Sequence, residues 1–262
     1  MIYYAVADVH GFYTLLEKAL RDAGFFDETE PCKLVVCGDL LDRGSEARQM
    51  IDFMLRLAEE DKLIYVFGNH EDLLYECLQK IVGGDVFEIA SGMSHHYTNG
   101  TWDTLLQISE LSATEAYKAP RELVRRVLNS PYYKKLLPLG VDYYETPHYI
   151  FTHGWIPSHA VGYKPYTTYT YEPGWREADE EQWRRARWYN GMQLACKQKV
   201  LEPEKTIVCG HWNASYGHAH IHRACSEWGS DAIFKPFLDH GIIALDACTK
   251  YSGQVNCVKI ED

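Results

Sequence analysis

The chain has 262 residues, of which 46% are hydrophobic, and its formal net charge at pH 7 is −11. This size and apolar content suit one folded core, and we expect a single domain over residues 1–262. An acidic surface repels phosphate backbones, and no apolar run approaches the roughly 18 residues of a membrane helix, so neither stable nucleic-acid binding nor membrane insertion is expected.

Five short apolar runs end at, or one glycine before, a residue whose side chain can bind a metal ion. Each run has the length and the β-branched or aromatic content of a buried strand. Ligands gather beyond strand ends, often the carboxyl ends, in sheets flanked by helices, so the runs predict an α/β fold with a metal site at the sheet edge. The runs are residues 2–7 before Asp8, 33–37 before Asp39, 63–67 before Asn69, 149–152 before His153, and 206–209 before His211.

The segments between these runs predict helices and two insertions. Apolar residues at helical spacing favour helices over residues 12–23 and 45–60, with Ser45 as a candidate N-cap. Residues 83–135 read as a helical insertion over one side of the sheet, with one helix starting near Ser112 and another over 121–128. Residues 156–203 form a second, aromatic-rich insertion that ends in a helix over 179–199. Residues 241–247 and 254–260 read as two closing strands.

The residues at the strand ends form a mixed oxygen and nitrogen ligand set. In extended backbone, Asp8 and His10 would point the same way because one residue separates them. Such donors suit Mn, Fe, Zn or Co better than Ca or Mg. Six ligands exceed what one catalytic ion needs, whereas two ions that share a carboxylate would use them all. The six are Asp8, His10, Asp39, Asn69, His153 and His211.

Three further residues add the chemistry of phosphate esters. Arg43 follows Asp39 by four residues, and a guanidinium there can hold phosphate oxygens with two hydrogen bonds. His70 directly follows Asn69, and an imidazole at the rim can protonate a leaving oxygen. Asp42 is the candidate carboxylate that orients this imidazole.

Taken in order, these blocks resemble the calcineurin-like metallophosphoesterases. Asp42-Arg43-Gly44 together with Gly68-Asn69-His70-Glu71 resembles the phosphoprotein (serine/threonine) phosphatase branch. The short length resembles bacterial members and the symmetrical diadenosine tetraphosphatases. The resemblance covers residues 2 to about 260 and is weakest in the insertions at about 83–135 and 156–203. The five blocks are Asp8-Val9-His10-Gly11, residues 38–44 from Gly38-Asp39 to Arg43-Gly44, Gly68-Asn69-His70-Glu71, Thr152-His153-Gly154 and Gly210-His211.

The resemblance implies a four-layer α/β/β/α sandwich with two transition-metal ions (Mn, Fe or Zn) above it. One ion would bind Asp8, His10 and Asp39. The other would bind Asp39, Asn69, His153 and His211. A hydroxide shared by the ions would attack phosphorus, and His70, with Asp42 behind it, would be the general acid.

The resemblance also implies a second phosphate-binding arginine between the fourth and fifth blocks. The candidates are Arg184, Arg185 and Arg187, of which Arg187 is preferred. With Arg43 and Asn69, it would complete the substrate-binding set.

Three functions remain open at this stage. The first is a serine/threonine protein phosphatase-like phosphoester hydrolase that acts on phosphoproteins or small esters. The second is a bis(5'-nucleosyl)-tetraphosphatase or a related nucleotide pyrophosphohydrolase. The third, a non-catalytic metal-bearing scaffold, is the least favoured because no inferred catalytic position is missing.

Several other features carry open interpretations. His218, His220 and His222 alternate, as they would on one face of a strand, and could form a further metal site or a polar loop. The pair His95-His96 has the same two interpretations, a metal site or a polar loop. The tyrosines of residues 163–171 could stack a nucleobase or pack a lid. The eight cysteines contain no C-x-x-C pair, which favours reduced thiols and a cytoplasmic location.

Overall fold

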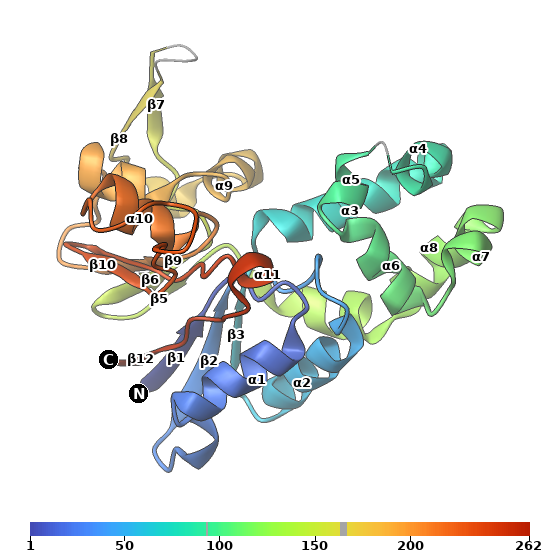
Figure 1. Ribbon diagram of the computed structural model, residues 1–262, viewed down its shortest axis with the longest axis horizontal. Helices are drawn as coiled ribbons and strands as arrows, with labels where there is room; N and C mark the ends of the chain where they lie inside the picture. The colour runs from blue at the N-terminus through green and yellow to red at the C-terminus, as the bar shows by residue number, and fades with distance from the viewer. Residues whose placement is uncertain (93, 163–166) are drawn as a thin grey trace.

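The computed structural model describes residues 1–92, 94–162 and 167–262. Its main strands form two five-stranded sheets, which lie side by side in Figure 1. The first has the order β12-β1-β2-β3-β4 and the second the order β10-β11-β9-β6-β5, while β7 and β8 form a separate hairpin. The strands are β1 Ile2–Val6, β2 Cys32–Cys37, β3 Leu63–Val66, β4 Gly140–Val141, β5 Tyr144–Glu145, β6 Tyr149–Phe151, β7 His159–Val161, β8 Thr168–Thr170, β9 Thr206–Cys209, β10 Phe237–Asp239, β11 Ile242–Ala244 and β12 Val258–Glu261.

The inner strands of both sheets are parallel. β1, β2, β3 and β4 run in one direction, and only β12 is antiparallel to them. In the second sheet β6, β9 and β11 are parallel, and β5 and β10 are antiparallel edge strands. Parallel strands end at the same edge of a sheet, so the segments that follow β1, β2 and β3 emerge together, as do those that follow β6, β9 and β11.

The strands are apolar on both faces because each sheet is covered on both sides. Along β1, Tyr4 and Val6 enter the core under the first sheet's helices, whereas Tyr3 and Ala5 enter the core between the sheets. A third core lies on the far side of the second sheet. These cores separate helices, sheet, sheet and helices in turn, and the α/β prediction is confirmed.

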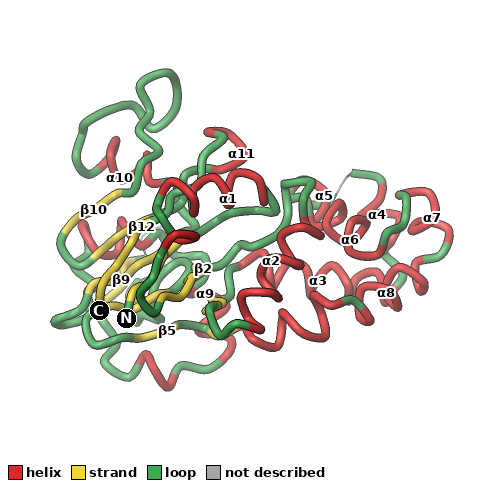
Figure 2. The backbone as a smooth tube through the Cα atoms, turned by 90° about the horizontal axis from the view of Figure 1, so that it is seen from below, coloured by secondary structure: helices red, strands yellow, loops and turns green. Residues whose placement is uncertain are grey.

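The helices divide between these outer layers and a lobe that extends from the first sheet. Figure 2 shows the strands gathered at one end of the molecule and most of α3 to α8 at the other. Trp102 and Leu123 of this lobe belong to the same core as Leu16 of α1 and Met50 of α2. The α-helices are α1 Tyr13–Asp22, α2 Ala47–Glu59, α3 Asn69–Gly83, α4 Val86–Ala90, α5 His95–Thr98, α6 Thr101–Ser109, α7 Ala113–Lys118, α8 Pro120–Asn129, α9 Glu180–Ala186, α10 Ala214–His220 and α11 Thr249–Ser252.

Short helical turns complete the described chain. Phe25–Asp27, Leu137–Leu139 and Trp175–Glu177 are 3-10 helices, and Tyr132–Leu136 and Gln193–Lys197 are π-helices. Among the residues described, none of the helices combines the length and the apolar character that crossing a membrane would need.

Three element predictions were wrong. Ser45 is not an N-cap, because α2 starts at Ala47 after Glu46 and no side chain caps it. The helix expected over 179–199 is broken between Ala186 and Gln193, where Gly191 packs so closely on Trp155 that an added Cβ would lie 2.6 Å from its ring. The closing strand expected over 254–260 is regular only over Val258–Glu261. In each case a tertiary contact or a loop takes precedence over local periodicity.

Candidate metal centre

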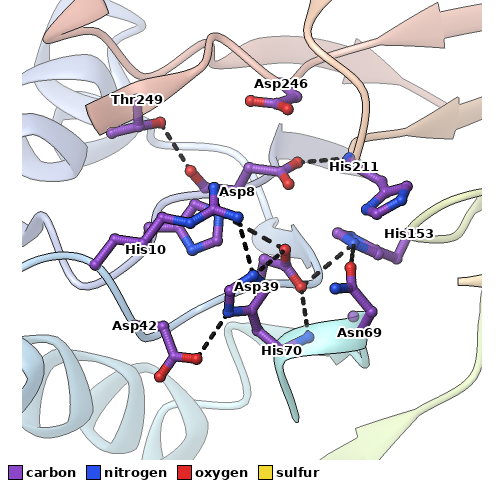
Figure 3. Close-up of polar contacts among 12 residues, drawn as sticks. Asp8, His10, Asp39, Asp42, Asn69, His70, His153, His211, Asp246 and Thr249 are labelled. Carbon is purple, nitrogen blue, oxygen red and sulfur yellow. Dashed lines mark hydrogen bonds and ion pairs between the residues drawn. The ribbon is translucent and has the colours of Figure 1, made fainter. Parts of the chain in front are cut away.

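The residues that follow the parallel strands converge where the two sheets meet (Figure 3). Ligand atoms of His10, Asp39 and His70 all lie within 4.8 Å of one another, and so do those of Asp39, His153 and His211. Asp39 belongs to both groups. One carboxylate therefore stands between two sets of imidazoles that come from opposite sheets.

Asp39 is a buried carboxylate surrounded by imidazoles. Burial by itself would raise its pKa, but His153 and then His70 and His10 offset burial and hold the pKa well below the usual range. The Asp39 carboxylate lies 3.3 Å from Nε2 of His153 and 3.6 Å from Nε2 of His10. The group is consequently ionised and available to cations.

Two histidines are held in the tautomer that binds metals. Nδ1 of His10 lies 3.0 Å from the Leu41 carbonyl oxygen, and Nδ1 of His153 lies 2.9 Å from that of Cys37. A carbonyl can only accept, so each Nδ1 carries the proton and each Nε2 lone pair faces the site. Burial lowers the pKa of both imidazoles, which favours the neutral form that binds a metal ion.

The surroundings of His153 test whether a cation fits. Its Nε2 faces Oδ1 of Asn69 at 2.9 Å and Oδ1 of Asp39 at 3.3 Å. In the neutral form of His153, all three atoms present lone pairs and none of them carries a proton. Such an arrangement is repulsive by itself and becomes attractive when the three atoms share a cation, so the residues fit a metal ion at this position.

Strained backbone accompanies these side chains. Six residues of the site have positive φ angles, a conformation that costs roughly 1–3 kcal/mol each and clusters at functional sites. They are Asp8 (53°), His10 (49°), Asp39 (56°), Asp42 (73°), Arg43 (63°) and His211 (69°). The expectation that Asp8 and His10 point the same way from an extended backbone was therefore wrong: left-handed turns send them to different partners.

Asp8 lies at the edge of this cluster. Its Oδ2 accepts a hydrogen bond of 2.9 Å from the backbone N–H of His211, and its backbone carbonyl accepts one of 2.7 Å from Thr249 Oγ1. Among the described residues, Asp8 is in neither of the two ligand groups. Burial, then Asp246, then Asp39 raise its pKa well above the usual value, and a divalent cation nearby would offset this cost.

The carboxylate of Asp246 was missed as a site residue. It is buried next to Asp8, and burial raises its pKa to about 6. The signal was present in the sequence, because Asp246 follows the apolar strand β11 just as the predicted ligands follow their strands. From the sequence, this sixth strand end was interpreted only as part of a closing strand over residues 241–247.

His70 is paired with Asp42, as expected. Nδ1 of His70 lies 2.7 Å from Oδ2 of Asp42, which also accepts a hydrogen bond of 2.7 Å from Thr101 Oγ1. Burial opposes protonation of His70, but Asp39 and Asp42 overcome it and raise its pKa. Thr101 comes from the helical lobe, so that lobe helps to fix the pair, a role that spacing did not reveal.

Arg43 reaches into the centre of the site. Its Nη1 lies 2.7 Å from Nε2 of His10, and its Nη2 lies 3.0 Å from Nε2 of His70. The guanidinium thus spans the two imidazoles with both terminal nitrogens, and these are the donors that grip a phosphate with two parallel hydrogen bonds.

Glu71 ties the loops together beneath the ligands. Its carboxylate accepts hydrogen bonds from the backbone N–H groups of Gly68 (2.6 Å), Asp39 (3.1 Å) and Leu40 (3.1 Å). Burial and then Asp39 raise its pKa to about 7. A glutamate three residues after the position that precedes a helix is a capping signal, which could have predicted this role.

Arg187, the preferred candidate for a second phosphate-binding arginine, is paired with two carboxylates in this structure. Its Nη1 binds both carboxylate oxygens of Asp72, at 2.7 and 2.8 Å, and its Nη2 lies 2.5 Å from Oδ1 of Asp142. The side chain is 6% exposed. These carboxylates occupy its terminal nitrogens and join the second insertion to α3 and to the segment after β4. Binding of phosphate would require this arrangement to open.

The alternating histidines His218, His220 and His222 do not lie on one face of a strand. His218 and His220 lie on helix α10 rather than on a strand, and His222 lies beyond its end. They bind Lys235, Glu227 and Asp239 respectively. The strand interpretation was wrong because alternation over five residues does not distinguish a strand from a helix end.

The tyrosine-rich segment is only partly described. Tyr163 and Tyr166 lie outside the described residues. Tyr169 packs against Tyr189, with ring centroids 4.6 Å apart, and Tyr171 donates a hydrogen bond of 2.7 Å to Glu202. Trp188, which the sequence did not single out, meets His211 edge to face at 5.5 Å and is 51% exposed.

Two ligand groups that share a carboxylate, with an arginine between their imidazoles, suit a metallophosphoesterase. The family model described as calcineurin-like phosphoesterase matches residues 1–243. The chain belongs to this family, as its sequence blocks predicted, and the family fold is confirmed with it.

Individual relatives agree with this assignment. A bis(5'-nucleosyl)-tetraphosphatase PrpE [asymmetrical] from Oceanobacillus iheyensis is 26% identical over 63% of this chain and 61% of its own length. One from Anoxybacillus flavithermus is 37% identical over 29% of this chain and 33% of its own. Serine/threonine-protein phosphatase 2 from Salmonella typhimurium is 32% identical over 43% of this chain and 45% of its own. Each match thus spans less than two thirds of the curated relative.

A solved structure supports the fold alone. The cold-active protein-tyrosine phosphatase of a psychrophilic Shewanella species matches with a TM-score of 0.51 and 18% identity. The match covers 100% of this chain and 75% of that one.

The helical lobe should constrain the Arg43 loop through Gly100. An added Cβ at Gly100 would overlap the backbone nitrogen of Arg43, whereas one at Gly84 would meet nothing within 4 Å, and both glycines have positive φ angles (86° and 106°). We expect Gly84→Ala to lower the free energy of unfolding by about 1–2 kcal/mol through backbone strain. Gly100→Ala should cost about 1–3 kcal/mol more through overlap. Urea unfolding measures both, and equal losses would contradict the contact.

Arg187 should act as a structural cation. Its loss would leave the largely buried carboxylate of Asp72, which is 19% exposed, without its partner. We expect Arg187→Met to lower the free energy of unfolding by about 2–4 kcal/mol, below the range for a fully buried pair because Asp142 is 39% exposed. The control is Arg185→Met, since Arg185 is 61% exposed and should contribute under about 1 kcal/mol. Similar stability of the two variants would refute the structural role.

Proposed function

We propose that this protein is a dimetal-dependent phosphoester hydrolase of the serine/threonine phosphatase type. The observation that carries the proposal is the position of Asp39, which belongs to both ligand groups while Arg43 reaches between His10 and His70. A scaffold that only bound metal would need neither the guanidinium at the ligands nor the His70–Asp42 pair.

The proposed ligand sets keep the predicted division. Asp8, His10 and Asp39 would hold one ion, and Asp39, Asn69, His153 and His211 the other. The neutral Nε2 atoms and the ionised carboxylate support Mn, Fe or Zn. For Asp8 to take part, its side chain would have to turn from the His211 N–H toward the first ion. Asp246 would then balance charge behind it.

The bound ions would supply a water molecule of lowered pKa and stabilise charge on the phosphoryl oxygens. The chain's own groups would orient the substrate. Arg43 would exchange its contacts with the two imidazoles for two phosphate oxygens. Asn69, next to His153 and close to Asp39, would lie at the same edge of the phosphate.

His70 would protonate the leaving oxygen. A contact from the Arg43 guanidinium requires a lone pair on Nε2 of His70 and therefore its neutral form. Once Arg43 turns to phosphate, Nε2 is free to carry a proton, and Asp39 and Asp42 favour that state. Asp42 holds Nδ1 at 2.7 Å, so the transferable proton stands on the nitrogen that faces the substrate.

A second candidate substrate is a dinucleoside polyphosphate. A cavity of about 760 Å³ adjoins the metal centre through Trp188 and is also lined by Tyr169, Tyr189 and Arg185. Aromatic faces and one arginine could receive a nucleobase and a distal phosphate. Relatives named bis(5'-nucleosyl)-tetraphosphatase support this alternative, and the relative named serine/threonine-protein phosphatase 2 supports the first.

The compartment is part of the proposal. All eight cysteines are free thiols, which supports a reducing, cytoplasmic setting. Phosphorylated proteins or small phosphate compounds would be the partners, and we expect no stable nucleic-acid complex or membrane attachment.

A substrate panel tests the function. With Mn²⁺ present, the rates on p-nitrophenyl phosphate, bis-p-nitrophenyl phosphate, a phosphopeptide and diadenosine tetraphosphate should show clear hydrolysis of phosphomonoesters. If the tetraphosphate is hydrolysed far faster than the phosphopeptide, the nucleotide alternative takes first place. Absence of turnover on all four compounds with metal bound would refute the hydrolase.

The role of His70 can be separated from metal binding. We expect His70→Asn to lower kcat by roughly 10²–10⁴ because the leaving oxygen loses its proton donor. Metal analysis should still find both ions, and the exposed control His240→Asn should change neither quantity. Loss of an ion from His70→Asn would identify His70 as a ligand instead of an acid.

A further inference from the structure

A second cluster of ligand-type side chains lies in the helical lobe. Glu76 on α3 and the neighbouring His95 and His96 on α5 bring one ligand atom each to within 4.8 Å of the others. The two imidazole rings lie 4.0 Å apart with a tilt of 37°. None of these residues belongs to the groups around Asp39, and the adjacent helices that carry them appear in Figure 1.

A second, independent observation at His96 also points to a ligand. Its side chain is fully buried, and among the residues that the structure describes neither Nδ1 nor Nε2 has a hydrogen-bond partner. A buried polar group without a partner costs about 1–3 kcal/mol, so such groups in native proteins generally serve a purpose. A metal ion would satisfy an imidazole nitrogen that has no partner within the described part of the chain.

We propose that Glu76, His95 and His96 form a third metal site, which takes a transition-metal ion of the zinc class. Two imidazoles and one carboxylate are a common protein ligand set for zinc, with a further position for water. Solvent can deliver the ion, because the side chain of Glu76 is 43% exposed and His95 is exposed.

The ion would replace an existing ion pair. Glu76 now accepts a hydrogen bond of 2.7 Å from Nη2 of Arg184 on α9. A divalent ion with two imidazole ligands outcompetes an exposed guanidinium for one carboxylate, since exposed pairs contribute under about 1 kcal/mol. Binding would release Arg184 and fasten α5 to α3.

The position gives the site a structural role. α5 ends at Thr98, and two residues later Gly100 packs against the backbone of Arg43. Fastening α5 would therefore steady the segment on which the Arg43 loop rests. This inference does not depend on hydrolysis, since the ligands are separate from the Asp39 centre.

Zinc stoichiometry of the full chain tests the site. In an Asp39→Asn background, where the main centre is impaired, equilibrium dialysis against Zn²⁺ should leave one bound equivalent, and zinc should raise the Tm. His95→Asn and Glu76→Gln in that background should each lose this equivalent and the Tm shift, while the exposed control His240→Asn keeps both. Unchanged zinc binding in the two ligand variants would overturn the proposal.

A crystal of the wild-type protein in zinc provides a measurement that needs no variant. The proposal predicts an anomalous peak between Glu76, His95 and His96. Peaks at Asp39 alone, with Arg184 still on Glu76, would show that the cluster is only an ion pair beside a buried histidine. If no zinc binds at the Asp39 centre but a peak appears at this cluster, the proposed function is contradicted and the third metal site is supported.

Discussion

The buried carboxylate of Asp39 is the constraint on which the rest of the site depends. It accepts a hydrogen bond of 3.0 Å from the backbone of His70 and lies close to imidazoles from both sheets. Its neighbours restrict its position. The side chain packs so closely on Gly68 that an added Cβ there would overlap Oδ1 of Asp39, and the backbone N–H of Asp39 donates a hydrogen bond to the Glu71 carboxylate. A carboxylate held this firmly can serve two cations only if both approach from fixed directions, and the two ligand groups provide those directions.

The surrounding fold accepts energetic costs to keep this geometry. Six site residues adopt left-handed conformations, and Asp8 and Asp246 are buried next to each other with raised pKa values. Glycines allow the loops to come together: a Cβ at Gly210 would overlap the Asp8 carboxylate, and one at Gly38 would lie 2.5 Å from the His153 ring. Two sheets packed through an apolar core supply the rigidity that holds these loops. Electron-pair donors that repel each other are thereby preorganised for cations.

The sequence predicted the strand ends well because a parallel sheet places them by a simple rule. Asp39, His70 and His153 meet as expected, since each lies within three residues of the end of a buried apolar run. The side-chain direction of Asp8 could not be predicted, because it depends on a left-handed turn and on a backbone N–H some two hundred residues later. The partners of Arg187 could not be predicted either, since Asp72 on α3 and Asp142 after β4 lie far from it in the sequence and meet it only in the folded chain. Local periodicity likewise could not foresee the break after Ala186, which the contact of Gly191 with Trp155 imposes.

The shared carboxylate is tested most directly by diffraction from a crystal grown with manganese, recorded at the manganese absorption edge. The account predicts two anomalous peaks about 3.5–4 Å apart, with oxygens of Asp39 bound to both. His10 should lie on one side of the pair and His153 on the other. A single peak, or two peaks of which only one contacts Asp39, would contradict it.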